Sequence, residues 1–313
     1  MTRPPDKGGG AKRRGVPVSE NNARVRRSSV GIIGLGIMGS AMSGNLVKAG
    51  FTVHGFDVVA ERRADFKSAG GAPVSSVAEI DDPIVITSLP SAEALHAVAA
   101  QMTAKCIVVE TSTLPIDEKV RARDVLAKKG IELLDCPLSG TGAQAKNKDL
   151  TVYGSGDNRA FETTKAVLEG FSRAHYYLGE FGNGSKMKYV ANLLVAIHNV
   201  AAAEAFVLGM KAGLDAETIY KVAGDGAGTS RMFQVRGPQM VEGRYDEATM
   251  KVEVWQKDMK IIGEYATKLG VPTPLFNASA ALYTAAMGQG FEKQDTAAVC
   301  AVLEALAGVK RRK

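Results

Sequence analysis

The chain has 313 residues, of which 45% are hydrophobic and 23% charged, the composition of a soluble globular protein with room for two domains. No segment reaches the roughly 18 consecutive apolar residues of a membrane-spanning helix. The longest apolar region, about 189–210, is interrupted by Asn192, His198, Asn199 and Glu204. We therefore expect a cytoplasmic protein without a membrane partner.

The formal net charge of +6 is concentrated at the two ends of the chain. Residues 1–28 hold eight Arg or Lys and two Asp or Glu, and residues 310–313 are all basic, so the globule between them has a small negative charge. This distribution differs from the basic face of a nucleic-acid-binding domain, and no nucleic-acid partner is expected. Residues 1–28, rich in Pro, Gly, Ser and Arg, are predicted to be a disordered basic tail.

Cysteine and histidine spacing does not indicate a metal site. The three cysteines are far apart, which favours reduced thiols in the core, and the four histidines are equally scattered. We expect no bound metal.

In chain order, short apolar segments alternate with helical patterns up to residue 134. Strands are predicted at 30–33, 51–56, 83–87, 106–109 and 131–134, and helices at about 40–49, 60–69, 91–102 and 115–129. This alternation predicts βαβ units and an α/β domain with a parallel sheet at its core.

The second half of the sequence has no further strand pattern. A helical pattern runs from Ser185 to Ala212, about 40 Å at 1.5 Å per residue, and helices are predicted at about 215–223, 251–269, 274–287 and 295–307. We expect a first domain over 29–181 and an all-α C-terminal domain over 182–309. The long helix that joins them is expected to be the hinge and the floor of an interdomain cleft.

A glycine motif follows the first strand directly and precedes a helix. In Gly34-x-Gly36-x-x-Gly39 the glycines permit a tight turn, close approach of a pyrophosphate and close helix packing, as in a Rossmann-type dinucleotide-binding domain. Asp57 ends the second strand 18 residues beyond Gly39, where a carboxylate binds ribose hydroxyls and disfavours a 2′-phosphate. NAD is therefore the expected cofactor, although Arg62 and Arg63 leave NADP open.

Two further segments carry side chains suited to chemistry on a hydroxy acid. Lys188 and Asn192 lie four residues apart on one helix face, where a desolvated lysine can exchange a proton with a carbinol or carbonyl oxygen. Lys186 is a competing candidate by the same reasoning. The turn at 139–142 precedes a helix and exposes backbone N–H groups to a substrate carboxylate, which Lys257 could also reach.

Together these segments resemble the β-hydroxyacid dehydrogenases, which include 3-hydroxyisobutyrate, tartronate semialdehyde (2-hydroxy-3-oxopropionate) and L-threonate dehydrogenases. The resemblance covers about 30–306 and includes a first domain like the NAD-binding domain of 6-phosphogluconate dehydrogenase. It rests on Gly-Leu-Gly-Ile-Met-Gly at 34–39, Leu89-Pro90, Ser112-Thr113, Asp-Cys-Pro-Leu-Ser-Gly at 135–140, Gly182-x-Gly184-x-x-x-Lys188-x-x-x-Asn192 and Lys257-Asp258.

The resemblance assigns a role to each matching position. It implies Lys188 as the proton donor and acceptor, with Asn192 orienting the substrate oxygen. The substrate carboxylate would bind Ser139, Gly140 and Thr141, with Lys257 nearby. The cofactor would contact Gly34, Leu35, Gly36, Ile37, Met38, Gly39, Asp57, Leu89, Pro90, Thr113 and Lys257.

The chain departs from the family pattern beside the substrate turn and elsewhere. Thr141 and Lys148 stand where glycines are usual, Ala191 precedes Asn192 where many relatives have a second Asn, and Pro115 comes one position early. The segment Arg231-Met-Phe233 favours the L-threonate branch. Two other functions remain open: an imine reductase, in which Asp or Tyr usually replaces the lysine, and a non-catalytic binding module that uses the basic tail. We also expect a homo-oligomer, a dimer or tetramer.

Overall fold

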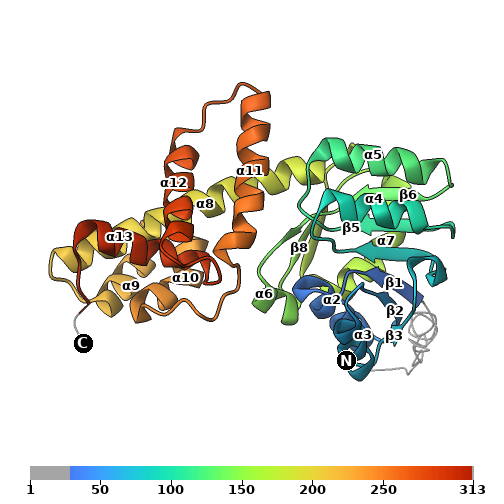
Figure 1. The fold of residues 1–313 in the computed structure, drawn as a ribbon, viewed down its shortest axis with the longest axis horizontal. Helices are drawn as coiled ribbons and strands as arrows, with labels where there is room; N and C mark the ends of the chain where they lie inside the picture. Colours follow the sequence, from blue (N-terminus) through green and yellow to red (C-terminus); the bar gives the residue numbers. More distant parts are fainter. Residues whose placement is uncertain (1–28, 312–313) are drawn as a thin grey trace, which may run out of the picture.

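The computed structural model describes residues 29–311, so the predicted basic tail over 1–28 lies outside the described residues. A sheet-containing part and a helical part lie side by side, and one long helix runs from the first into the second (Figure 1). The predicted α/β domain followed by an all-α domain is confirmed.

The first part is built on six parallel strands in the order β3-β2-β1-β4-β5-β6. The order reverses between β1 and β4, and ligands of such sheets bind beyond the carboxyl ends of the strands at this point. The strands are β1 (Ser29–Ile33), β2 (Thr52–Phe56), β3 (Ala72–Pro73), β4 (Ile84–Thr87), β5 (Ile107–Glu110) and β6 (Glu132–Asp135).

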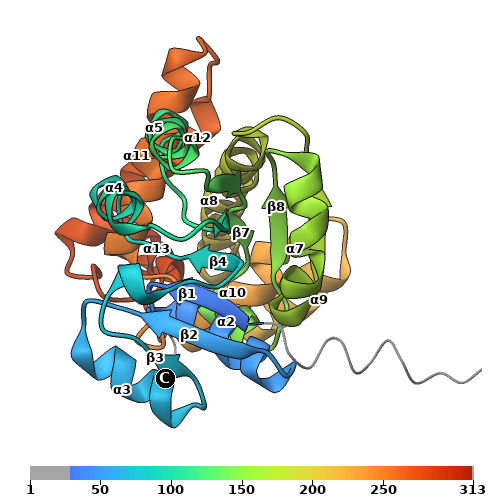
Figure 2. The same cartoon turned by 90° about the vertical axis from the view of Figure 1, so that its right-hand side faces the viewer.

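Helices cover both faces of this sheet. Figure 2 shows α7 on one side and α4 and α5 on the other, and two apolar clusters fill the layers between helices and sheet. The elements are α2 (Ile37–Lys48), α3 (Ala60–Ser68), the 3₁₀ turn η2 (Val77–Glu79), α4 (Ala92–Gln101), α5 (Ile116–Ala127) and α7 (Asn158–Phe171). The five predicted strands all form, each shifted by no more than one residue at its start.

A second sheet of three short strands follows, which the sequence analysis did not predict. It consists of β7 (Leu138–Ser139), β8 (Thr151–Gly154) and β9 (Ala174–Tyr177), with the five-residue helix α6 (Gly142–Lys146) between the first two. A bridge between Asp135 and Ser155 links this sheet to the end of β6. The strands have two to four residues, too few for a pattern of alternating hydrophobicity to be recognisable.

Helix α8 (Asn183–Lys211) connects the two parts and is the central helix of the second one. By length and a mean hydropathy of 1.8 it is the one described helix that could cross a membrane, yet Ala196, Ala203 and Phe206 are fully buried against the helices around it. Those helices are α9 (Ala216–Asp225), α10 (Arg231–Glu242), α11 (Val252–Lys268), α12 (Pro274–Gly288), the 3₁₀ turn η3 (Thr296–Ala298) and α13 (Val299–Ala307).

Helix α10 was not predicted, because it contains Gly237-Pro238, a pair that usually ends a helix. Gly237 is required for packing here: a Cβ at this position would lie 2.4 Å from the ring of Tyr220 on α9.

Candidate active site

The glycine motif forms the turn between β1 and α2, at the carboxyl end of the sheet. Gly34 has φ +95°, and a Cβ there would lie 2.1 Å from the carbonyl oxygen of Ser88. A Cβ on Gly39 would collide with the Gly34 carbonyl, whereas a Cβ on Gly36 would meet nothing within 4 Å. Gly36 is the N-cap residue of α2, and no side chain caps this end of the helix. The first turn of α2 therefore offers free N–H groups to a phosphate, which fits a dinucleotide cofactor. Leu35 is buried, its N–H donates to Asp57 and its carbonyl oxygen accepts from the Ser40 hydroxyl, so the predicted cofactor contact of Leu35 has no free polar group in the described structure.

Asp57 at the end of β2 is buried and holds the glycine turn in place. Its carboxylate accepts hydrogen bonds from the backbone N–H of Leu35 (2.8 Å) and of Val59 (2.9 Å). Arg62 lies 3.3 Å from the same carboxylate, and Arg63 donates to the Asp57 carbonyl oxygen. The positive charge of Arg62 is thus already paired with a carboxylate.

The loops after β4 and β5 meet beside the glycine turn. The hydroxyl of Ser112 accepts a hydrogen bond from the Leu89 N–H (2.8 Å), while Pro90 is exposed. The ammonium of Lys257, on α11 of the helical part, donates to the carbonyl oxygen of Thr113 (2.9 Å). Lys257 therefore lies on the side predicted for the nicotinamide.

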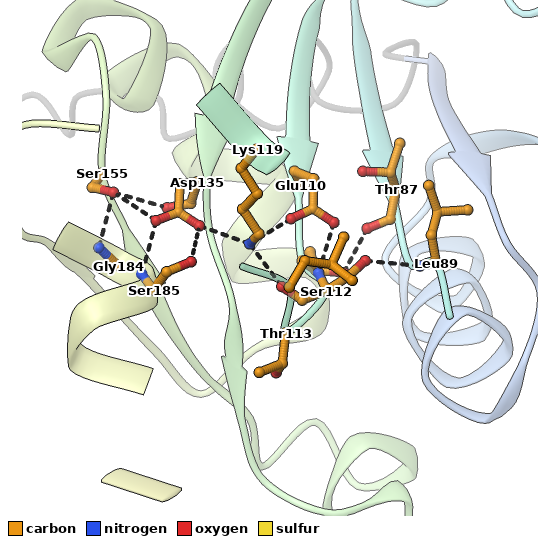
Figure 3. Close-up of polar contacts among 12 residues, drawn as sticks. Thr87, Leu89, Glu110, Ser112, Thr113, Lys119, Asp135, Ser155, Gly184 and Ser185 are labelled. Atoms are coloured by element: carbon orange, nitrogen blue, oxygen red, sulfur yellow. Dashed lines mark hydrogen bonds and ion pairs between the residues drawn. The ribbon is translucent and has the colours of Figure 1, made fainter. Parts of the chain in front are cut away.

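A buried ionic network ties these loops to the start of α8 (Figure 3). The Lys119 ammonium is completely buried and contacts the carboxylates of Glu110 on β5 and Asp135 on β6 (2.8 Å to Asp135), as well as the Ser112 carbonyl oxygen (2.7 Å). Asp135 in turn accepts from the N–H and the hydroxyl of Ser185, at 2.8 Å each. Lys119 was not singled out from sequence, because a lysine in a charged helix normally faces solvent.

Lys188 is one turn further along α8 than Ser185 and is 9% exposed. Burial lowers the pKa of its ammonium group, the Asp258 carboxylate opposes that shift, and Lys257 adds to it. Asp258 is buried as well and accepts a hydrogen bond from the Asn192 amide (2.9 Å); burial raises the pKa of its carboxyl. Lys186, the competing candidate, is exposed and hydrogen-bonds Asn183.

A cavity of about 350 Å³ lies next to Lys188 and Asn192. The structure places these two side chains and the turn Ser139, Gly140 and Thr141 around one cavity. Lys257 is absent from its lining. The remaining lining residues were not predicted as site residues: Gln144, Asp149, Thr151, Arg173, Val195, Arg231, Met232, Arg236, Met250 and Trp255.

Thr141 and Lys148, which stand where the family usually has glycine, have different structural consequences. Thr141 caps α6, and its N–H donates to the Gln144 side chain (3.0 Å), so this N–H is not free for a carboxylate in the described conformation. Lys148, just beyond α6, has φ +58° and is the one non-glycine residue with positive φ among residues 29–311. A glycine is favoured at such a helix end because it lacks a Cβ.

The cysteines and the possible metal ligands of the described chain do not form a further site. Cys106, Cys136 and Cys300 are free thiols in the core, as predicted. Across residues 29–311 there is no group of three or more His, Cys, Asp or Glu side chains that could hold a metal ion.

Comparison with protein families matches both halves of the chain. Residues 29–179 match the family model for the NAD binding domain of 6-phosphogluconate dehydrogenase. Residues 182–303 match the model described as NAD-binding of NADP-dependent 3-hydroxyisobutyrate dehydrogenase. L-Threonate dehydrogenase from Cupriavidus necator is 34% identical over 281 residues, 87% of this chain and 94% of that protein.

The chain belongs to the β-hydroxyacid dehydrogenase family. It is an NAD(P)-dependent hydroxyacid oxidoreductase, as the sequence analysis expected. Among solved structures, 3-hydroxyisobutyrate dehydrogenase from Salmonella typhimurium superposes with a TM-score of 0.80 at 28% identity, covering 88% of this chain and 99% of that one. An imine reductase from Streptomyces aurantiacus superposes less well, with a TM-score of 0.57 at 19% identity over 88% of this chain and 99% of that one, and shares the fold alone.

Proposed function

We propose that this dehydrogenase interconverts a short β-hydroxy acid and its semialdehyde or keto form, with Lys188 as the general acid and base. The observation that carries this proposal is the position of the Lys188 ammonium: it is buried, next to Asp258, and lines the same cavity as the turn 139–141. A buried lysine with a lowered pKa can be neutral in part of the population, as a base for an alcohol must be.

In the oxidative direction the neutral Lys188 amine accepts the hydroxyl proton of the substrate as the C–H bond breaks. A bound nicotinamide supplies the acceptor for the hydride that leaves this carbon. The products are a carbonyl group and the Lys188 ammonium ion, and the reverse reaction returns the proton to the carbonyl oxygen. The Asp258 carboxylate stabilises the positive charge of the Lys188 ammonium ion.

Asn192 and the turn 139–141 orient the substrate. The Asn192 amide nitrogen is fixed by Asp258, which supports a role for this side chain in holding the reacting oxygen close to Lys188. Ser139 and Gly140 are assigned to the substrate carboxylate. Thr141 is assigned to the same group, and in the described conformation its N–H donates to Gln144.

The cofactor we propose is NAD in preference to NADP. Buried Asp57 is assigned to the adenosine ribose, with residues 34–39 at the pyrophosphate and Leu89, Pro90, Thr113 and Lys257 on the nicotinamide side. The pairing of Arg62 with Asp57 supports this preference, because a 2′-phosphate would compete with that carboxylate.

We further propose that residues 29–181 form the cofactor-binding domain and residues 182–309 the helical domain. The enzyme is proposed to be cytoplasmic and to form a dimer or tetramer. Exposed apolar side chains along α8, among them Val190, Leu194 and Leu208, support burial against a second copy. L-Threonate is the first substrate to test, because L-threonate dehydrogenases are similar along nearly the whole chain.

Nicotinamide absorbance during incubation with short β-hydroxy acids tests this proposal. L-Threonate, 3-hydroxyisobutyrate, glycerate and the corresponding aldehydes are assayed with NAD and NADP, beside a panel of cyclic imines. Turnover of a hydroxy acid with NAD is expected. Turnover of imines alone contradicts the proposed chemistry, and equal kcat/KM with both cofactors contradicts the proposed cofactor preference.

A further inference from the structure

The substrate cavity extends away from the reacting end, toward charged side chains. Its lining includes Lys188 and Asn192 but no residue of 34–39, nor Leu89, Pro90 or Thr113. The volume of about 350 Å³ is therefore on the substrate side of Lys188. It falls within the roughly 300–1,000 Å³ of pockets that accept drug-sized ligands, more than a three-carbon acid fills.

Positive charge exceeds negative charge on the cavity wall. The four cations in the lining are Lys188, Arg173, Arg231 and Arg236, and the one anion is Asp149. Lys188 is balanced by Asp258, as described above. Arg236 is buried and its Nε donates to Asp295 (3.0 Å), which balances its charge as well. The charged lining residues not yet accounted for are Arg173, Arg231 and Asp149.

Asp149 is already hydrogen-bonded to one of these two arginines. Its carboxylate accepts from Arg173 Nε (2.7 Å) and from the Gln144 amide (3.1 Å), and both interactions hold the pKa of the Asp149 carboxyl below its usual value. Arg231 Nη2 is 4.0 Å from the same carboxylate, beyond hydrogen-bond distance. The Arg231 side chain is 67% exposed and its guanidinium donates no hydrogen bond within residues 29–311, so Arg231 is the arginine of this pair that is available to a further anion.

A second, buried donor faces the same space. Arg236 is 4% exposed, donates Nε to Asp295 and Nη1 to the sulfur of Met232, and its Nη2 makes no hydrogen bond within residues 29–311. Both arginines are on α10, which is part of the helical domain, while the turn 139–141 belongs to the other domain. Arg231 is connected to the turn through Asp149, which accepts a hydrogen bond from Gln144, whose side chain in turn accepts from the Thr141 N–H. An anion held by Arg231 would therefore lie near the turn, on the solvent-exposed side of the cavity.

We propose that the substrate carries a second anionic group, a carboxylate or a phosphate, and that Arg231 binds it with help from Arg236. This inference rests on the proposed function and narrows its substrate to dianionic hydroxy acids. A guanidinium presents paired N–H donors that match carboxylate and phosphate oxygens, which explains why an arginine suits this position. Arg231 then determines specificity without touching the reacting carbon.

Substrate pairs that differ in one group test this proposal. 2-(Hydroxymethyl)butanoate and hydroxymethylsuccinate differ by a methyl against a carboxylate, and L-threonate and its 4-phosphate differ by a hydroxyl against a phosphate. In one of the two pairs, we expect the wild-type kcat/KM to be at least tenfold higher for the dianion than for the monoanion. That pair identifies the second anionic group as a carboxylate or a phosphate. Arg231→Gln should lower kcat/KM for that dianion at least tenfold relative to the monoanion and so remove the preference. Arg244→Gln, an exposed arginine outside the cavity on the same domain, is the matched control and should change neither.

Binding without turnover keeps this test independent of the proposed reaction. Calorimetry of the full chain with glutarate and with butanoate compares a dianion and a monoanion directly, and glutarate is expected to bind at least tenfold more tightly through Arg231. Equal binding of the two acids, or an Arg231→Gln variant that loses both equally, overturns the proposal. Turnover of monoanions with no preference for dianions overturns it while leaving the proposed function intact.

Discussion

Asp135 accepts two hydrogen bonds from Ser185, one from the backbone N–H and one from the hydroxyl, each 2.8 Å long. This pair joins the last strand of the parallel sheet to the first turn of α8, and Lys188 follows one turn later. Lys119 holds the same carboxylate from the other side and also contacts Glu110 and the Ser112 carbonyl (Figure 3). The cofactor-side loop and the proposed proton-transfer residue thus share one rigid support.

Replacing Lys119 by Met should destabilise the fold strongly. The change leaves the buried carboxylates of Glu110 and Asp135 without their shared cation, and breaking a buried ion pair in this way costs about 3–5 kcal/mol. Urea denaturation measures the loss. Lys128→Met, at the exposed residue directly after the same helix, is the control and should change the free energy of unfolding by less than about 0.5 kcal/mol. A similar decrease in the free energy of unfolding in both variants would show that the ion pairs of Lys119 contribute little to stability.

Removing the Asp258 charge should shift the pH dependence of activity. Asp258 stabilises the Lys188 ammonium, so Asp258→Asn lowers the pKa of Lys188 further. Oxidation requires the neutral amine, so its rate increases as pH rises through that pKa, and this rise should move to lower pH in the variant. Reduction requires the ammonium ion, so the rate of reduction should begin to fall at a lower pH in the variant than in the wild type. An unchanged profile in kcat would mean that Lys188 does not titrate in the reaction.

Lys148→Gly should stabilise the protein. The backbone of Lys148 has φ +58°, a conformation that costs a residue with a Cβ about 1–2 kcal/mol, whereas glycine adopts it readily. We expect a gain of about 1 kcal/mol, which raises Tm by roughly 1–2 °C for a protein of this size. Lys146→Gly, at the last residue of α6, should instead lower stability, by at most about 1 kcal/mol. A loss of stability in both variants contradicts this account of the helix end.

Asp57→Asn should weaken the preference for NAD. The change removes the negative charge next to Arg62 and frees that guanidinium for a 2′-phosphate. We expect the ratio of kcat/KM with NAD to that with NADP to fall by about 10- to 100-fold, in line with 1–3 kcal/mol for one charge-assisted contact. Asp65→Asn, an exposed position on α3, controls for the lost charge. An unchanged ratio would show that Asp57 serves only to hold the glycine turn.

Residues in regular patterns could be predicted from sequence, and residues that depend on tertiary contacts could not. Five of the six strands of the parallel sheet are short segments rich in apolar residues and bounded by turns, and the glycine motif with Asp57 has fixed spacing, so these were recognisable. The two-residue strand β3 was not predicted, because two residues carry no hydrophobic pattern. Burial distinguishes Lys188 from Lys186, but the sequence alone gives these two lysines equal claims until the family resemblance is considered.

The unpredicted parts of the site come from distant segments that meet in the fold. Arg173, Arg231 and Asp149 belong to three different segments, and nothing in their local sequence indicates that they line one cavity. Lys119 has a charged helix around it, yet its own ammonium is fully buried between two strands. Asp258 was part of a recognised motif, but its contact with Asn192, 66 residues away, appears only in the structure.

The central claim is that Lys188 transfers the proton, and one comparison tests it most directly. Lys188→Met and Lys186→Met are assayed for NAD reduction in a single turnover at saturating NAD, with NAD affinity measured separately. Loss of general acid–base catalysis should slow Lys188→Met by about 10²- to 10⁴-fold with NAD affinity intact, while Lys186→Met stays within twofold of wild type. A Lys188→Met enzyme that turns over at the wild-type rate would contradict the account.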